Sequence, residues 1–139
     1  MDVAALFGRM TLAETLVDGA RREGVRPPNR GAFPSEAEAL AEVVRRLVRA
    51  FYPQEVRLFG SRADGRAAPD SDFDLLVVLD DDAPDGLLDP DMIYRPLVGC
   101  GIGCDVIACR RGELDAVLRD AANPWGPVWA RARVVHARP

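Results

Sequence analysis

Two aspartates separated by one residue are the clearest chemical feature of the sequence. Asp72 and Asp74 stand at the start of an apolar run, Phe73 to Leu79, which is typical of a central β-strand covered on both faces. Side chains two residues apart on a strand project from the same face, so the two carboxylates would lie a few ångströms apart. Such a pair repels itself and favours a divalent cation, and oxygen ligands suit Mg²⁺ that also binds substrate phosphates. The pair therefore predicts a magnesium site.

A third aspartate could join this pair. Asp105 lies near the start of another expected strand, Gly103 to Cys109, and reaches the pair if the two strands are neighbours in the right register; otherwise it is a surface residue. Three carboxylates can hold two ions, which would bind the attacking and departing oxygens of a phosphoryl or nucleotidyl transfer. Asp105 is then the candidate base that takes the proton of the attacking hydroxyl.

Two plainer interpretations of these aspartates compete. The pattern Asp70-x-Asp72-x-Asp74 also resembles the start of an EF-hand calcium loop, but Leu75 stands where that loop needs Gly and Asp81 where it needs Glu. Aspartate is also common in turns, so solvated residues at a strand end are the second alternative.

A turn of small residues precedes the aspartates. The expected strand Glu55 to Phe59 runs into Gly60 and Ser61, where backbone N–H groups and a hydroxyl could hold the distal phosphates of a nucleotide. Arg62 and Arg66 are the nearest cations able to offset phosphate charge.

Together these motifs resemble the signature of the DNA polymerase β-like nucleotidyltransferase superfamily. The matching elements are Leu58-Phe59-Gly60-Ser61-Arg62, the ten residues from Arg62 to Ser71, Asp72-Phe73-Asp74-Leu75-Leu76, and Asp105-Val106 as the third acidic position. The resemblance covers about Val56 to Cys109. The short chain is similar to the minimal nucleotidyltransferase (MNT) proteins, which often act as antitoxins beside HEPN-type toxins, and to the catalytic domain of aminoglycoside nucleotidyltransferases. One departure is Asp64, where relatives commonly have a basic residue.

The resemblance implies an α/β (α+β) fold with a small mixed sheet flanked by helices. It also implies two Mg²⁺ ions and transfer of a nucleoside monophosphate, with AMP favoured, from a triphosphate to a hydroxyl acceptor. The implied catalytic and metal-binding residues are Asp72, Asp74 and Asp105, and the nucleotide-binding residues are Gly60, Ser61 and Arg62. The acceptor would be a HEPN-type toxin or a small hydroxylated molecule. The alternative, favoured by Asp64 and by the open placement of Asp105, is an antitoxin-like module with little or no activity that neutralises a partner by contact.

Helices and strands expected around the motifs would position them. Ser35 followed by Glu38 forms a capping box, which predicts a helix that Pro53 ends. Its expected inward residues are Leu40, Val44, Leu47, Val48 and Phe51.

The remaining elements are shorter. Asp89 could cap a short helix with Pro90 at its first position. A helix is expected over Glu113 to Ala122 and an edge strand over Arg133 to Ala137. The inward residues of that helix would be Leu114, Val117, Leu118 and Ala121. Trp125 and Trp129 are expected as core anchors, and Asp80, Asp81 and Asp82 as a solvated turn.

Two parts of the chain are expected from composition. Residues 1–34 would hold an amphipathic helix, over about 3–20, and a Pro/Gly-rich connector, whereas residues 35–139 would form the nucleotidyltransferase domain. The helix would either pack on the sheet, which we favour, or bind a partner.

Overall composition narrows the class of protein. No apolar run approaches the roughly 18 residues of a membrane span, and no secretory signal is visible, so we expect a cytoplasmic protein. The net charge of −4 disfavours nucleic acid as a partner and a template-copying polymerase as the activity. Cys100, Cys104 and Cys109 are expected as reduced thiols. A chain with no second domain would need a partner protein or a homodimer to complete the acceptor site.

Overall fold

A four-stranded mixed sheet forms the centre of the protein. The computed structural model describes residues 26–139, so the helix expected over residues 3–20 lies outside the described residues. The strand order is β3-β2-β1-β4, with β1 antiparallel to both of its neighbours and β2 parallel to β3. The strands are β1 (Glu55–Phe59), β2 (Phe73–Leu79), β3 (Cys104–Arg110) and β4 (Arg133–Ala137).

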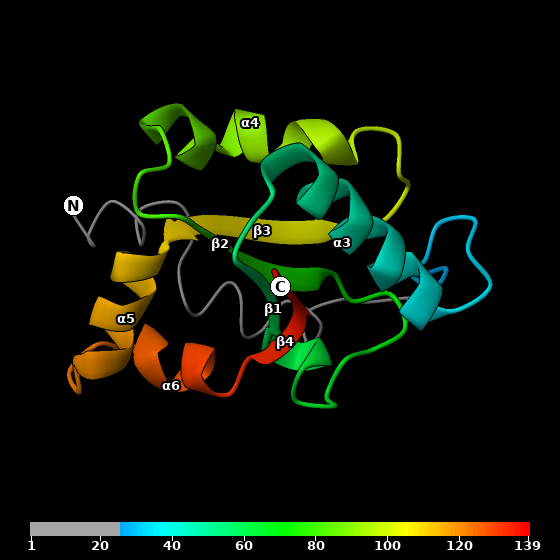
Figure 1. Cartoon of the computed structure of the whole chain (residues 1–139). Coiled ribbons are helices and arrows are strands. Elements are labelled where there is room, and N and C mark those ends of the chain that lie inside the picture. The colour runs from blue at the N-terminus through cyan, green and yellow to red at the C-terminus, as the bar shows by residue number, and fades with distance from the viewer. Residues whose placement is uncertain (1–25) are drawn as a thin grey trace.

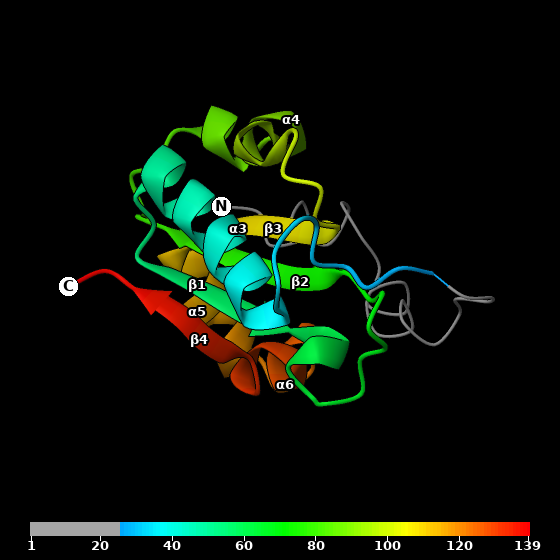
Figure 2. The same cartoon turned by 90° about the vertical axis from the view of Figure 1, so that its right-hand side faces the viewer.

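Helices cover both faces of this sheet (Figure 1). Helices α3 (Glu36–Phe51) and α4 (Pro90–Tyr94) lie on one face, and α5 (Arg111–Arg119) and α6 (Trp125–Ala130) on the other. Figure 2 shows α3 in front of the sheet and α5 partly hidden behind it. Three short 3₁₀ helices complete the described part: η2 (Gly60–Arg62), η3 (Asp85–Leu88) and η4 (Arg95–Leu97). The predicted α/β fold, a small mixed sheet flanked by helices, is confirmed.

Helix α3 begins where the capping box predicted. The Ser35 hydroxyl accepts a hydrogen bond from the Glu38 N–H at 3.1 Å, and Tyr52 ends the helix in a left-handed conformation just before Pro53. The predicted inward face is displaced by one residue. The most buried side chains are Ala39, Val43 and Leu47, whereas the other predicted residues are only half-buried. The arc of apolar side chains is wide, and the sheet contacts its centre.

The predicted central strand is confirmed in β2. All of its residues are buried, and their side chains alternate between two cores. Phe73, Leu75 and Val77 pack towards α3, whereas Leu76 and Val78 pack towards α5 and α6. A strand buried on both faces has no polar alternation, which explains the continuous apolar run.

Helix α5 differs from its prediction at both ends. It begins two residues earlier, because the Glu113 carboxylate accepts a hydrogen bond from the Arg110 N–H at 3.0 Å. It ends at Arg119, because the Asp120 carboxylate accepts a hydrogen bond from the Ala122 N–H and starts a turn. Leu118 is therefore 39% exposed, and Ala121, also predicted inward, is exposed beyond the helix.

The other predicted elements are observed with small shifts. Strand β3 begins at Cys104, one residue later than expected, and β4 is the predicted edge strand. Asp89 caps α4 with Pro90 at its first position, and Trp125 and Trp129 are both buried in the core under α5 and α6. The three cysteines are free thiols. Within residues 26–139 no helix has the length and apolar character needed to cross a membrane.

Candidate active site

The sheet brings two of the predicted carboxylates side by side. Asp74 is the register partner of Asp105 across the parallel strands β2 and β3. Paired residues of parallel strands project from the same face, so the register condition for Asp105 is met. Leu76 and Ile107 are the next pair along the two strands on that face, and they pack into the core of α5 and α6. Asp74 is 1% exposed, and Asp105 is half-buried.

Gly60 lies directly against the Asp74 carboxylate. Its φ of 73° belongs to the left-handed region, and a Cβ atom built on it would collide with Asp74 Oδ2. The backbone of η2 therefore approaches this carboxylate as closely as only glycine allows. The next residue, Ser61, is 5% exposed, and its hydroxyl has no hydrogen-bond partner among residues 26–139. The small-residue turn and the buried aspartate thus form one cluster.

Asp72 lies at the entrance of β2, next to the loop that leads into β3. A Cβ atom built on Gly103 would collide with Asp72 Oδ1, so the carboxylate packs on the Gly103 backbone. The Phe73 N–H donates a hydrogen bond to the Gly103 carbonyl at 3.1 Å. Asp72 therefore stands where the two parallel strands begin.

The thiol of Cys104 lies near all three carboxylates. Its pKa is raised to about 12, first by burial, then by the Cys100 thiol and by the negative charges of the aspartates. Those aspartates are Asp72, Asp105 and Asp74. Burial also raises the pKa of Tyr94, whose hydroxyl accepts a hydrogen bond from the Val106 N–H, and the charge of Asp105 adds to that shift. All three carboxylates thus lie near enough to the Cys104 thiol to raise its pKa.

This cluster suits Mg²⁺ by its chemistry, although it does not enclose an ion. Carboxylate oxygens are the donors that Mg²⁺ prefers, and Mg²⁺ commonly takes one or two of them and completes its shell with water and substrate phosphates. Asp74 Oδ2 fills the space that a side chain at Gly60 would occupy. Among the described residues, no group of three or more His, Cys, Asp or Glu side chains is arranged to hold a metal. The role of Asp105 as a metal ligand stays a prediction.

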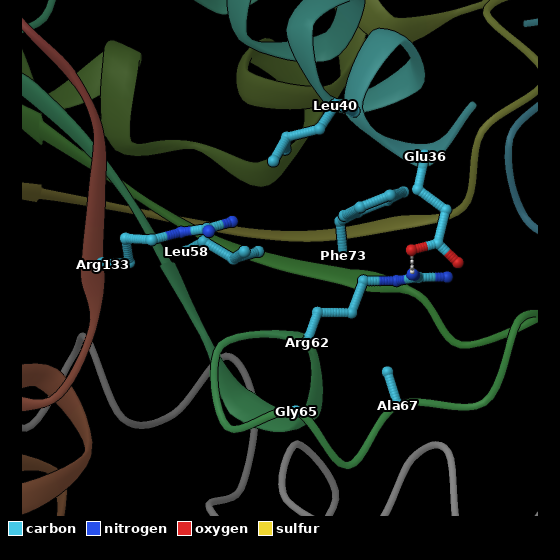
Figure 3. Close-up of a pocket in the computed structure, with 9 residues that line it drawn as sticks. Glu36, Leu40, Leu58, Arg62, Gly65, Ala67, Phe73 and Arg133 are labelled. Carbon is cyan, nitrogen blue, oxygen red and sulfur yellow. Dashed lines mark ion pairs between the residues drawn. The ribbon is translucent and has the colours of Figure 1, made fainter.

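Arg62 lies on the opposite face of the sheet from these carboxylates. Figure 3 shows its side chain beside Phe73 and Glu36. It lines a pocket of about 390 Å³ together with Leu58 and Phe73, which belong to the core under α3. Its guanidinium lies 4.2 Å above the Phe73 ring and pairs with Glu36 at 3.1 Å. It also donates hydrogen bonds to the carbonyls of Ser71, at 2.8 and 3.0 Å, and of Pro69, at 3.1 Å. The structure therefore does not bring Arg62 together with Gly60, Ser61 and the aspartates in the way the sequence suggested.

The other predicted phosphate-binding cation is also engaged. Arg66 pairs with Asp64 at 2.9 Å, in the loop after η2. The acidic residue that departs from the family pattern is thus neutralised by its neighbour. Its Arg66 partner remains 57% exposed and lies at the surface.

Asn29 is a site residue that sequence analysis missed. It belongs to the Pro/Gly-rich connector, yet its side chain bonds to the backbone on both sides of the carboxylate cluster. An asparagine in a loop is too common a signal to identify such a role in advance.

Comparison with known families agrees with this geometry. A family model described as nucleotidyltransferase domain matches residues 38–114, which is more than half of the chain and contains η2, β2 and β3. The chain therefore belongs to the nucleotidyltransferase domain family, which supports nucleotidyl transfer from a nucleoside triphosphate as its general activity. No curated protein and no solved structure matches it.

Proposed function

We propose that this protein transfers a nucleoside monophosphate, with AMP favoured, from a triphosphate to a hydroxyl acceptor and releases pyrophosphate. The observation that carries the proposal is the close approach of Gly60 to the buried Asp74, opposite Asp105, inside the residues that match the family. This arrangement puts a phosphate-binding type of turn within contact of the Asp74 carboxylate.

The reaction forms one bond and breaks one. The acceptor oxygen bonds to the α-phosphorus, and the bond from that phosphorus to the bridging oxygen of the β-phosphate breaks, so pyrophosphate leaves with the electron pair. The proton of the hydroxyl goes to a carboxylate, and Asp105 is the proposed base. Asp72 and Asp74 would hold Mg²⁺, which when bound stabilises the charge of the transferring group.

Ser61 is the proposed donor to the distal phosphates. Its buried hydroxyl has no partner among the described residues, and it follows Gly60, whose backbone lies against the Asp74 carboxylate. We assign Arg62 an indirect part, since its guanidinium holds the carbonyls of the loop before Asp72.

The acceptor needs more surface than this domain offers. We propose that a partner protein or a second copy completes the site, as expected from the resemblance to minimal nucleotidyltransferases. A hydroxyl side chain of a HEPN-type toxin is the favoured acceptor, and a small hydroxylated molecule is the alternative.

A second candidate is an antitoxin-like module that neutralises a partner by contact. It is favoured by one observation on the phosphate-binding side: both predicted cations are engaged in contacts within the protein, Arg62 with loop carbonyls and Arg66 with Asp64. A module of this kind would keep the transferase fold but not need nucleotide or metal.

Labelled nucleotides distinguish the two candidates. Purified protein is incubated with Mg²⁺ and each α-³²P-labelled triphosphate, with and without the product of the neighbouring reading frame. Label transferred by wild type but not by the Asp72→Asn/Asp74→Asn variant supports the enzyme and identifies base and acceptor. Inhibition of the partner that survives Asp72→Asn, with no label moved and no nucleotide binding by calorimetry, supports the contact module instead.

A further inference from the structure

Asn29 bonds to two chain segments that are far apart in sequence. Its Nδ2 donates to the Ser71 carbonyl at 2.9 Å and to the Gly103 carbonyl at 2.8 Å. Its Oδ1 accepts from the Gly103 N–H at 2.6 Å, and its own backbone N–H donates to the Pro69 carbonyl at 2.8 Å. One side chain thus satisfies both hydrogen-bonding functions of its amide by joining the two segments.

Those two segments lead directly into the carboxylates. Ser71 precedes Asp72, and Gly103 stands two residues before Asp105. Parallel strands begin at the same edge of a sheet, and hairpin turns cannot join them there. Asn29 adds a second link between the β2 and β3 entrances, beside the backbone hydrogen bond from the Phe73 N–H to the Gly103 carbonyl.

Because Asp72 contacts Gly103, the hydrogen bonds of Asn29 to Gly103 also affect the position of the Asp72 carboxylate. The space beside Gly103 holds Asp72 Oδ1, and Asn29 Nδ2 lies 3.4 Å from the position of a Cβ atom built there. Any shift of Gly103 relative to Asp72 therefore moves the surface on which that carboxylate rests.

We propose that Asn29 is a positioning residue that sets the distance between Asp72 and Asp105 by fixing the entrances of β2 and β3. This inference rests on the proposed function, because it takes the two aspartates as parts of one site. Asn29 acts through the backbone and touches neither substrate nor metal. Outer residues of this kind commonly change metal affinity or activity 10- to 100-fold when they are replaced.

The connector also forms a wall beside Asp72. A cavity of about 260 Å³ is lined by connector residues 26–29 and by Asp70, Asp72 and Gly101. Asn29 therefore stands between this cavity and the strand entrances, and residues 26–29 belong to the framework of the site.

Binding of Mn²⁺ alone tests the positioning role. Free Mn²⁺ is measured by electron paramagnetic resonance in titrations of the full chain without nucleotide. We expect Asn29→Ala to weaken Mn²⁺ binding by about 10-fold or more. The matched control is Asn123→Ala, which removes another loop asparagine whose Oδ1 accepts from the Trp125 N–H at 2.9 Å, at the start of α6. Unchanged binding in Asn29→Ala, an equal loss in both variants, or no Mn²⁺ binding by wild type overturns the inference.

A double-mutant cycle tests whether Asn29 and Gly103 act through the same carboxylate. Gly103→Ala drives a methyl group against Asp72 from the other side, and Gly86→Ala is its control, because a Cβ atom there has no neighbour within 4 Å. If both residues act through the position of Asp72, the effects of Asn29→Ala and Gly103→Ala on Mn²⁺ affinity are non-additive. Additive effects overturn the inference.

Label transfer, measured in the same variants, separates this inference from the proposed function. A fall of kcat in Asn29→Ala at unchanged KM for the triphosphate supports positioning, since only the transition state loses stabilisation. Transfer at the wild-type rate by Asn29→Ala overturns the inference and leaves the proposed function standing. Mn²⁺ binding that depends on Asn29, without transfer of any nucleotide, supports positioning of the metal site and contradicts the proposed function.

Discussion

The two ends of β2 carry the same kinds of residue and use them differently. At the far end, Arg138 makes two hydrogen bonds to the Asp80 carboxylate, at 2.7 and 3.1 Å, and Gln54 adds a third at 2.8 Å. At the near end, Arg62 follows the turn beside Asp74, yet its guanidinium lies on the other face of the sheet and binds loop carbonyls. The first arginine stabilises an aspartate, whereas the second stabilises the loop that leads to one.

This difference shows what separates a structural aspartate from a candidate catalytic one. Hydrogen bonds from Arg138, and then from Gln54, lower the pKa of Asp80 to about 2. Asp80 was expected in a solvated turn with Asp81 and Asp82, and the structure instead ties it to the C-terminal segment. An arginine lies near an aspartate at each end, and the direction of its side chain separates the two roles.

Neutralising one aspartate at each end should give the largest contrast. We expect Asp74→Asn to lower the rate of label transfer by on the order of 10³-fold, because a buried carboxylate of the proposed site is lost. Asp80→Asn should leave transfer unchanged, since Asp80 lies at the far end of the strand. Single-turnover rates with the labelled triphosphate measure both. Equal losses in the two variants would remove the distinction between the two ends.

Replacing each arginine of the near end should show whether it stabilises the fold or binds phosphate. We expect Arg62→Ala to lower the free energy of unfolding by about 3 kcal/mol, because the carbonyl of the buried Ser71 loses two hydrogen bonds from a charged donor. Arg66→Ala should change it by only about 0.5 kcal/mol, since its pair with Asp64 is at the surface. Urea titrations at neutral pH measure both values. An Arg62→Ala variant of normal stability but weaker triphosphate binding would return Arg62 to its predicted role.

Removing the contact between Asp80 and Arg138 at the far end should give the smallest effect, a change in how stability depends on pH. The pKa of Asp80 is about 2 in the folded protein and ordinarily 3.8, so the contact with Arg138 stabilises the fold above about pH 4. That stabilisation is lost as the pH falls from about 4 to about 2. In Arg138→Ala we expect a flatter dependence of the urea midpoint over this range. Arg119→Ala, at an exposed helix end, is the control, and equal slopes in Arg138→Ala and wild type would contradict the assignment.

Local signals explain which elements were predictable. The Ser35 and Glu38 pattern marks the start of α3 because the capping hydrogen bond joins residues three apart. The apolar run of β2 indicates burial on both faces, and this is observed. The predicted ends of α5 were wrong. The Glu113 and Asp120 carboxylates accept hydrogen bonds from nearby backbone N–H groups, and these contacts shift both ends of the helix by a few residues.

Long-range contacts explain which parts of the site were not predictable. Arg62 was expected to bind the phosphates because it follows Gly60 and Ser61 in the sequence. The direction of its side chain depends instead on Glu36 and on the Phe73 ring. Asn29 bonds to Gly103 across 74 positions, and Arg138 reaches Asp80 across 58. No periodicity or spacing encodes partners at such separations.

The sequence by itself determined the order of the elements, the family and the candidate residues Gly60, Ser61, Asp72 and Asp74, because those depend on short-range spacing along strands and turns. The tertiary structure alone decided that Asp105 stands opposite Asp74. It also decided that Arg62 turns away from them and that Asn29 links the strands that carry them. Strand register and side-chain direction follow from packing between distant segments, and the chain acquires these contacts only when the sheet and its two helical layers come together.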